Sequence, residues 1–184
     1  MATVAHPPLE PAEFLALQSS AGWRMAVELI QSEAVVIPPS GAAASSAQGE
    51  LFFALRSWQE AESDAGLLLQ DVFVELPGHQ FLAPDIAWWS PERRPTVGEG
   101  AIGIVPDLVV EVLSPATRSN DLGIKRTLYL EVGVQELWLA DPSAKTLTRA
   151  RPSAIDEELS SKDTLRTDLL PSFALALRRV FTVS

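Results

Sequence analysis

The amino-acid sequence predicts an α/β fold in which a mixed central sheet is flanked by helices. The run 108–113 is aliphatic at nearly every position, which is typical of a central strand that is covered on both faces. A helical pattern follows at about 121–132, with Gly133 as its C-terminal stop, and 136–140 reads as a second short buried strand. A strand, a crossover helix and another strand in this order imply a mixed sheet with helices packed against it.

The remaining elements are predicted from periodicity and from turn residues. We expect a first helix at 10–18 and a long helix at 45–61, where large apolar residues recur at spacings of three and four. The other expected elements are two short strands within 25–37, strands at 68–76, 81–89 and 146–151, a polar loop at 154–164 and a closing segment at 169–180.

Length and composition indicate the general class of protein. The 184 residues fit one domain, with 1–22 as a helical lead-in and 152–184 as a C-terminal closing segment. The absence of cysteine excludes disulfides and thiolate-based zinc or iron sites. The first 13 residues do not have the pattern of a signal peptide, and no apolar run approaches the roughly 18 residues of a membrane span. We therefore expect a cytoplasmic protein that does not enter membranes.

The net charge of −10 weighs against a protein whose main task is to grip nucleic acid, because phosphate binding normally needs a surplus of Lys and Arg. A local basic patch can coexist with an acidic whole. Such a positive rim can be drawn from Arg93, Arg94, Arg118 and Arg126, although four solvated arginines explain the same residues equally well.

Two carboxylates stand in predicted strands, where charge is unusual. Asp85 follows Pro84 within 81–89, and Glu111 interrupts the aliphatic run 108–113. A carboxylate in such a place is costly to desolvate unless it is paired, protonated or bound to a metal ion. On neighbouring strands, the two groups would offer hard oxygen ligands for Mg²⁺ or Mn²⁺. For Glu111 alone, a buried salt bridge or a hydrogen bond to a loop amide is an equally good explanation.

Lys125 is the third unusual residue. At about 100° per residue, it falls near the middle of the apolar arc of the predicted helix, together with Leu122 and Tyr129. One interpretation is that its ammonium meets an anion; the other is that its stem packs while the charge reaches solvent. The nearby carboxylates favour a paired, functional lysine. If the charge serves chemistry alone, Lys125→Met should leave the fold intact or even stabilise it.

Several segments together have the pattern of a known family. They are 28–33, 84–87, 106–115, 121–125, Tyr129, 133–134 and 138–142, the longest of which reads Pro-Asp-Leu-Val-Val-Glu-Val-Leu-Ser-Pro. Over these segments the chain resembles the Uma-two family of restriction-endonuclease-like proteins, which are common in photosynthetic bacteria. The resemblance extends over about 26–151, most of the chain.

The resemblance implies a restriction-endonuclease-like nuclease core of the PD-(D/E)XK type. Asp85 would be its first acid and Glu111 its second, and both would bind the metal ion. The superfamily pattern puts a lysine where this chain has Leu113, and Lys125 in the following helix would take its place. The implied function is a Mg²⁺- or Mn²⁺-dependent endonuclease that hydrolyses phosphodiester bonds in nucleic acid, most plausibly DNA, as a homodimer.

Two other functions remain open at this point. One is a catalytically impaired binding or assembly protein that keeps the nuclease fold, and the other is a metal-dependent hydrolase of small phosphate esters. Family members often carry Glu or His near the start of the long helix, where this chain has only Gly, Ala and Ser at 41–46. Ser32 also replaces a usual glycine. The first departure predicts slow cleavage that is stronger with Mn²⁺ than with Mg²⁺.

Overall fold

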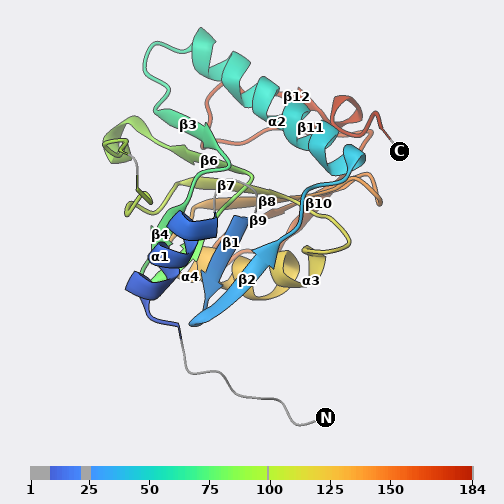
Figure 1. The fold of residues 1–184 in the computed structure, drawn as a ribbon. Coiled ribbons are helices and arrows are strands. Elements are labelled where there is room, and N and C mark those ends of the chain that lie inside the picture. The colour runs from blue at the N-terminus through green and yellow to red at the C-terminus, as the bar shows by residue number, and fades with distance from the viewer. Residues whose placement is uncertain (1–8, 22–25, 99, 184) are drawn as a thin grey trace.

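A central six-stranded sheet organises the chain. The computed structural model describes residues 9–21, 26–98 and 100–183 (Figure 1). The strand order is β10-β9-β8-β7-β6-β3; β7 and β8 run parallel, and every other neighbouring pair is antiparallel. The strands are β3 (Leu67–Gln70), β6 (Ile86–Trp89), β7 (Leu108–Val112), β8 (Glu136–Asp141), β9 (Thr146–Ala150) and β10 (Glu157–Ser160). The predicted mixed sheet is therefore confirmed.

Two smaller sheets complete the β structure. The first has the order β2-β1-β5-β4, and the second pairs β11 with β12. Their strands are β1 (Ala26–Ile30), β2 (Glu33–Ile37), β4 (Val74–Leu76), β5 (Gln80–Leu82), β11 (Thr164–Leu165) and β12 (Leu175–Ala176). The predicted hairpin is confirmed over the residues described, which do not include Met25. Gln31 and Ser32 make its two-residue turn with φ of 51° and 64°, the left-handed backbone that such hairpins need.

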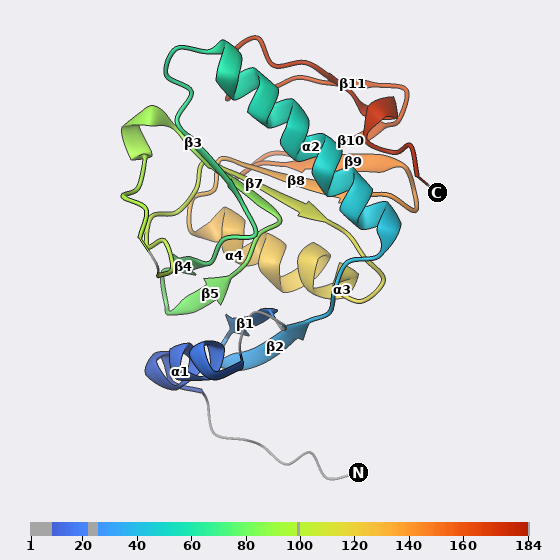
Figure 2. The same cartoon turned by 45° about the horizontal axis from the view of Figure 1, so that its top comes forward.

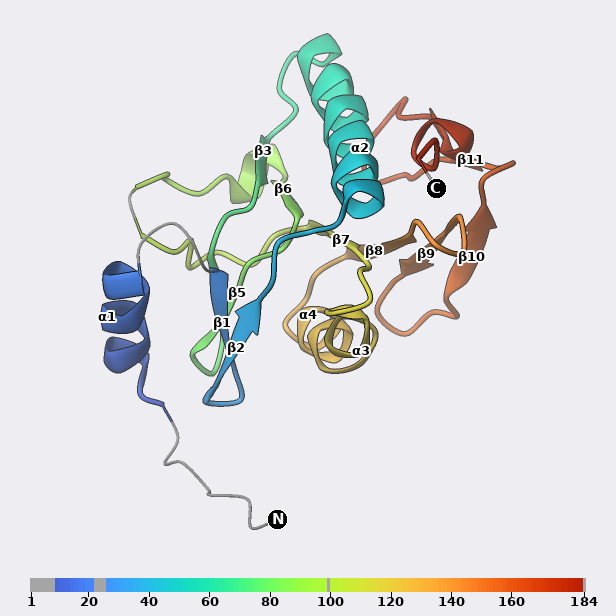
Figure 3. The ribbon, with the colours of Figure 1, turned by 45° about the vertical axis from the view of Figure 1, so that its right-hand side comes forward.

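Helices cover both faces of the central sheet. α2 (Ala42–Ala61) lies across one face, and the helix formed by α3 (Arg118–Asn120), the π-helical turn η3 (Asp121–Lys125) and α4 (Arg126–Glu131) lies across the other (Figures 2 and 3). α1 (Pro11–Ala21) packs beside the small sheet of β1 and β2. Two single turns of 3₁₀ helix are η2 (Pro91–Arg93) and η4 (Leu177–Arg179). No helix among the described residues is long and apolar enough to span a bilayer.

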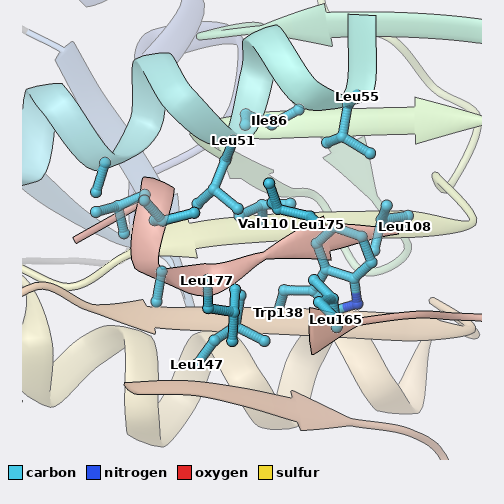
Figure 4. Packing of buried hydrophobic residues seen from close by; sticks show 14 of the residues in the cluster. Leu51, Leu55, Ile86, Leu108, Val110, Trp138, Leu147, Leu165, Leu175 and Leu177 are labelled. Atoms are coloured by element: carbon cyan, nitrogen blue, oxygen red, sulfur yellow. The ribbon is translucent and has the colours of Figure 1, made fainter. Parts of the chain in front are cut away.

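Alternation along β7 divides the core into two layers. Leu108, Val110 and Val112 pack with α2 and with apolar residues of the C-terminal segment, such as Leu175 (Figure 4). The side chains between them point to the opposite face, where Val109 joins Tyr129 of α4 and Leu137 of β8. Each large side chain buried in this way stabilises the fold by about 1.5–3 kcal/mol. Because both faces are covered, β7 is aliphatic throughout except at Glu111.

The C-terminal end of α4 has the predicted glycine stop. Gly133 adopts φ of 98°, which a residue with a side chain rarely takes. The N–H of Val134 donates to the carbonyl of Tyr129, and the N–H of Gly133 donates to the carbonyl of Leu130. This pair of bonds satisfies two carbonyl groups that the helix end would otherwise leave unpaired.

Three predicted elements are wrong in their extent. The stretch 68–76 is two strands, β3 and β4, in different sheets, because the chain bends at Asp71 with φ of 50°. The stretch 81–89 is likewise split into β5 and β6 by a short connection that contains Pro84, which has no N–H to give to a ladder. The expected loop at 154–164 contains β10, which extends the sheet edge next to β9. Alternating apolar residues indicate strands but do not show where the chain changes sheets.

Candidate functional site

The register between β6 and β7 brings Asp85 and Glu111 together. Ile86 pairs with Val110 in this antiparallel ladder, so Asp85, one residue before β6, lies beside Glu111. Both residues project toward the face that α4 covers, because each alternates with neighbours that pack on α2. The sequence predicts that Asp85 lies inside a strand. In the structure it lies one residue before β6, at the entrance to that strand.

Asp85, Glu111 and Lys125 line one cleft of about 90 Å³. The wall of this cleft is made by β2, by the connection after β7 and by η3. Two further carboxylates, those of Glu28 and Asp121, also line it. Four carboxylates therefore surround one ammonium group, which gives the cleft a formal charge of −3 when all the groups are ionised.

The Lys125 ammonium lies among three of these carboxylates. Its Nζ is 2.8 Å from Oε1 of Glu111, 2.9 Å from Oε1 of Glu28 and 3.4 Å from Oδ1 of Asp121. Only 3% of Lys125 is exposed to solvent, and the three acids are equally buried. The paired interpretation of Lys125 therefore holds in the structure, and the ammonium does not reach solvent. An ammonium has three donors, so each can be directed to one carboxylate.

The two proposed metal ligands each have one oxygen occupied by the protein. Oδ2 of Asp85 accepts the N–H of Val112 at 2.6 Å, and Oε1 of Glu111 accepts the hydroxyl of Tyr129 at 2.8 Å as well as the contact from Lys125. Among the described residues, the other oxygen of each carboxylate makes no hydrogen bond. The protein thus fixes both side chains and leaves one oxygen of each for a further ligand.

The helix that carries Lys125 contains a π-helical turn, η3. Asp121, Lys125 and Tyr129 are all buried, at spacings of four residues along η3 and α4. A π turn bonds residues five apart and so shifts the face that follows it. An arc drawn for a regular α-helix placed Leu122 on the buried side, but Leu122 is 40% exposed. The sequence therefore predicted the orientation of Lys125 but not that of Leu122.

Burial and charge move the pKa values of the cluster in a consistent direction. Burial raises the pKa of Asp85 from 3.8 to about 6, although the Val112 N–H and Lys125 oppose the shift. Burial also raises the pKa of Glu111 well above its ordinary value, with Lys125 opposing and the other acids adding to the rise. Burial alone would lower the pKa of Lys125, but Glu111, Glu28 and Asp121 raise it above its usual range. The lysine stays charged, while Asp85 and Glu111 hold protons more tightly than they would in water.

The chemistry of the donor set fits a hard divalent cation. Protons bind Asp85 and Glu111 tightly because both carboxylates are buried and neighbouring acids add to the effect, and a bound divalent cation would favour their charged forms instead. No group of three or more His, Asp or Glu residues in the described part of the chain is placed to hold a metal ion by itself. Mg²⁺ keeps several waters and needs only one or two carboxylates from the protein, which Asp85 and Glu111 supply.

Glu28 and Asp121 are two residues of the cleft that the sequence analysis missed. Glu28 lies in an apolar strand just as Glu111 does, and this is the signal that identifies it in retrospect. Asp121 precedes Lys125 by four residues, a spacing that puts both on one helix face. The stretch 41–46, where the family resemblance led us to expect Glu or His, does not line the cleft; Ser40, just before it, does.

The four arginines considered as a positive rim are all engaged in ion pairs. Each one contacts an aspartate: Arg93 contacts Asp107, Arg94 contacts Asp64, Arg118 contacts Asp141 and Arg126 contacts Asp156. They are neither a free basic rim nor simply solvated side chains. Among the residues that line the cleft, Lys125 is the one cation.

This mixed sheet, with helices on both faces, has the architecture of restriction-endonuclease-like nucleases. The family model Uma2, described as "Putative restriction endonuclease", matches residues 11–178, so the chain belongs to this family. The chain is also similar to a crystal structure described as "a putative nuclease belonging to DUF820" from Anabaena variabilis ATCC 29413. The TM-score is 0.81 at 23% identity, over 95% of this chain and 98% of that one. No curated protein matches the chain.

Replacing the Asp85 carboxylate by an amide should stabilise the fold at high pH. Because folding raises its pKa, folded Asp85 binds more protons than the unfolded chain between about pH 4 and 6, so its contribution to stability falls as pH rises through this window. A rise in pKa of this size corresponds to at most about 3 kcal/mol, and the partial exposure of Asp85 reduces this. We expect Asp85→Asn, which keeps an acceptor for Val112, to have the higher free energy of unfolding at pH 8.

Urea unfolding in EDTA at pH 4 and pH 8 measures this difference. It should nearly vanish at pH 4, where Asp85 is protonated. Asp64→Asn, at an exposed ion pair with Arg94, is the matched control and should change stability by less than about 1 kcal/mol at either pH. If the wild type were more stable than Asp85→Asn at pH 8, the ionised Asp85 carboxylate would not be destabilised by burial, and the prediction would be wrong.

Lys125→Met should destabilise the fold, contrary to the expectation from the sequence. The substitution leaves Glu28, Glu111 and Asp121 buried without their cation, a change that typically costs about 3–5 kcal/mol. We expect a large fall in melting temperature at pH 8 and a smaller one at pH 5, where protons replace the missing charge. Thermal melts at both pH values test this.

Two further variants control the lysine experiment. Lys162→Met, at an exposed position, should change stability by less than about 0.5 kcal/mol. Adding Glu111→Gln to Lys125→Met removes one of the unpaired charges and should restore part of the loss. An unchanged melting temperature for Lys125→Met would instead mean that the lysine is retained for chemistry alone.

Proposed function

We propose that this protein is a metal-dependent endonuclease that hydrolyses phosphodiester bonds in nucleic acid. The observation that carries the proposal is that Asp85 and Glu111 lie side by side in one cleft with Lys125 bonded to Glu111. Membership of the restriction-endonuclease family supports the same substrate class. DNA as the substrate and a homodimer as the working form belong to the proposal through the family resemblance.

Asp85, Glu111 and Lys125 have separate roles in the proposed reaction. Asp85 and Glu111 would hold Mg²⁺ or Mn²⁺, and the ion would supply Lewis-acid activation of the phosphate and of an attacking water. The Val112 N–H and the Tyr129 hydroxyl orient the two carboxylates, so little reorganisation is needed before reaction. Lys125 orients the attacking water or stabilises the negative charge that develops on the phosphoryl oxygens.

The electrostatics of the cleft favour two other functions. Its formal charge is negative, and the arginines at positions 93, 94, 118 and 126 are already paired, so a nucleic-acid backbone meets few free cations there. This supports the alternative of an impaired nuclease-fold protein that binds or assembles without cleaving. The same shortage of free cations also favours a metal-dependent hydrolase of small phosphate esters, which carry fewer phosphate charges than a nucleic-acid backbone.

A cleavage time course distinguishes these functions. Plasmid DNA, single-stranded DNA, RNA and bis(p-nitrophenyl) phosphate are incubated at low salt with Mg²⁺ or Mn²⁺. We expect slow cleavage of nucleic acid that is faster with Mn²⁺, because Mn²⁺ binds N/O sites more tightly than Mg²⁺ and tolerates looser geometry. Asp85→Asn and Glu111→Gln should abolish it, whereas Glu92→Gln, an exposed acid outside the cleft, should not.

Each other result favours a particular alternative. Hydrolysis of the small ester alone would identify a phosphoesterase. No cleavage of any substrate would favour the binding protein. Equal rates with Mg²⁺ and Mn²⁺ at catalytic turnover would refute the prediction of an impaired site, because the residues of 41–46 would then not be limiting.

A further inference from the structure

Glu28 joins two parts of the candidate site that are far apart in the sequence. It lies in β1 of the small sheet, is 2% exposed and lines the cleft. Its Oε1 accepts the backbone N–H of Ala83 at 2.9 Å and also the ammonium of Lys125 at 2.9 Å. Ala83 precedes Asp85 by two residues, in the connection between β5 and β6. One oxygen therefore links the Asp85 connection to the helix that carries Lys125.

We infer that Glu28 is a positioning residue that keeps Lys125 in the cleft when Glu111 binds a divalent cation. This inference rests on the proposed function. Glu111 is shared between Lys125 and Tyr129, and its charge would be shared again with a metal ion. Its attraction for the ammonium then weakens. A buried ammonium needs a remaining anion, because it is costly to leave unpaired.

Glu28 is better placed than Asp121 to supply that anion. Asp121 is 3.4 Å from Nζ and belongs to the same helix as Lys125, so it moves with the lysine. Oε1 of Glu28 is 2.9 Å from Nζ of Lys125, and Glu28 belongs to β1 of the small sheet rather than to the helix. Because the same oxygen accepts the Ala83 N–H, Glu28 fixes the helix relative to the connection that carries Asp85. Because Glu28 holds Lys125 with its own oxygen, this contact leaves the oxygens of Asp85 and Glu111 available for the metal ion. Its role is to hold the lysine rather than to touch the substrate.

The accessibility of the Lys125 amine tests this inference without reference to cleavage. Purified wild type and Glu28→Gln are labelled with acetic anhydride at pH 8, in EDTA or in Mn²⁺, and acetylation of Lys125 is followed by mass spectrometry. Glutamine keeps an acceptor for Ala83 and for Lys125 but loses the charge. Wild type should label slowly in both conditions. Glu28→Gln should label slowly in EDTA and about tenfold faster in Mn²⁺, because local opening then exposes the lysine.

Asp121→Asn is the matched control, because it removes a charge next to the same ammonium without touching the Ala83 connection. Its labelling should rise by less than about threefold on adding Mn²⁺. Rapid labelling of wild type in Mn²⁺ would overturn the inference, as would Mn²⁺-independent labelling of Glu28→Gln. Fast labelling of Glu28→Gln already in EDTA, with a lower melting temperature, would mean that Glu28 only supports the fold, and would also overturn it.

The labelling result and the cleavage result separate the two proposals. The expected labelling pattern in a protein that cleaves nothing would refute the nuclease function and still support the positioning role of Glu28. Cleavage without any Mn²⁺ dependence of labelling in Glu28→Gln would support the nuclease and refute the positioning role.

Discussion

The ion pairs of the buried Lys125 ammonium are the interaction on which the arrangement of the site depends. Glu28 comes from the small sheet, Glu111 from the central strand β7, and Asp121 from the crossover helix itself. An apolar cluster that includes Ile30, Val109 and Tyr129 also joins these three elements, but the lysine alone ties them through charge at the cleft. The central strands supply a rigid base, since β7 is covered on both faces, and the lysine fixes how the helix and the small sheet sit against it. The cleft lies where these elements meet around the Lys125 ammonium.

The same cluster lowers the stability of the fold and provides the groups that the proposed function needs. Burial makes Asp85 and Glu111 weaker acids than they are in water. The neighbouring acids add to this effect, because one ammonium does not neutralise four carboxylates. A protein selected for stability alone would replace such a cluster by apolar side chains, which is often neutral or favourable. The oriented carboxylates, each with an oxygen left for a ligand, are instead the arrangement that a hard cation needs. In our proposal the metal ion completes the charge balance that the chain leaves open.

Much of the fold and part of the site were predictable from the sequence, for identifiable reasons. Glu111 and Lys125 were noticeable because each interrupts an apolar pattern, and the Gly133 helix stop follows from the preference of glycine for positive φ. The β1–β2 hairpin was predicted from its two short strands, although Gln31 and Ser32 are not favoured turn residues. The strand break at Pro84 has a local signal in the proline itself. The break at Asp71, the π turn at 121–125 and the role of Glu28 were not predictable in this way. They depend on contacts between segments far apart in the chain, such as Glu28 with Ala83 and Lys125. The four arginine–aspartate pairs are likewise tertiary, so local charge patterns could not separate a free rim from a paired one.

The central claim is that the cleft carries excess negative charge and that a bound metal ion balances it. Calorimetric titration with Mn²⁺ tests this claim most directly. The titration is run near pH 6 in two buffers of different ionisation enthalpy, for wild type and for Glu111→Gln. Metal ions displace protons from their ligands, so the account predicts that wild-type binding releases protons and that the measured heat differs between the buffers. Glu111→Gln should bind much more weakly. Equal affinity in Glu111→Gln, or wild-type binding whose heat is the same in both buffers, would contradict the account.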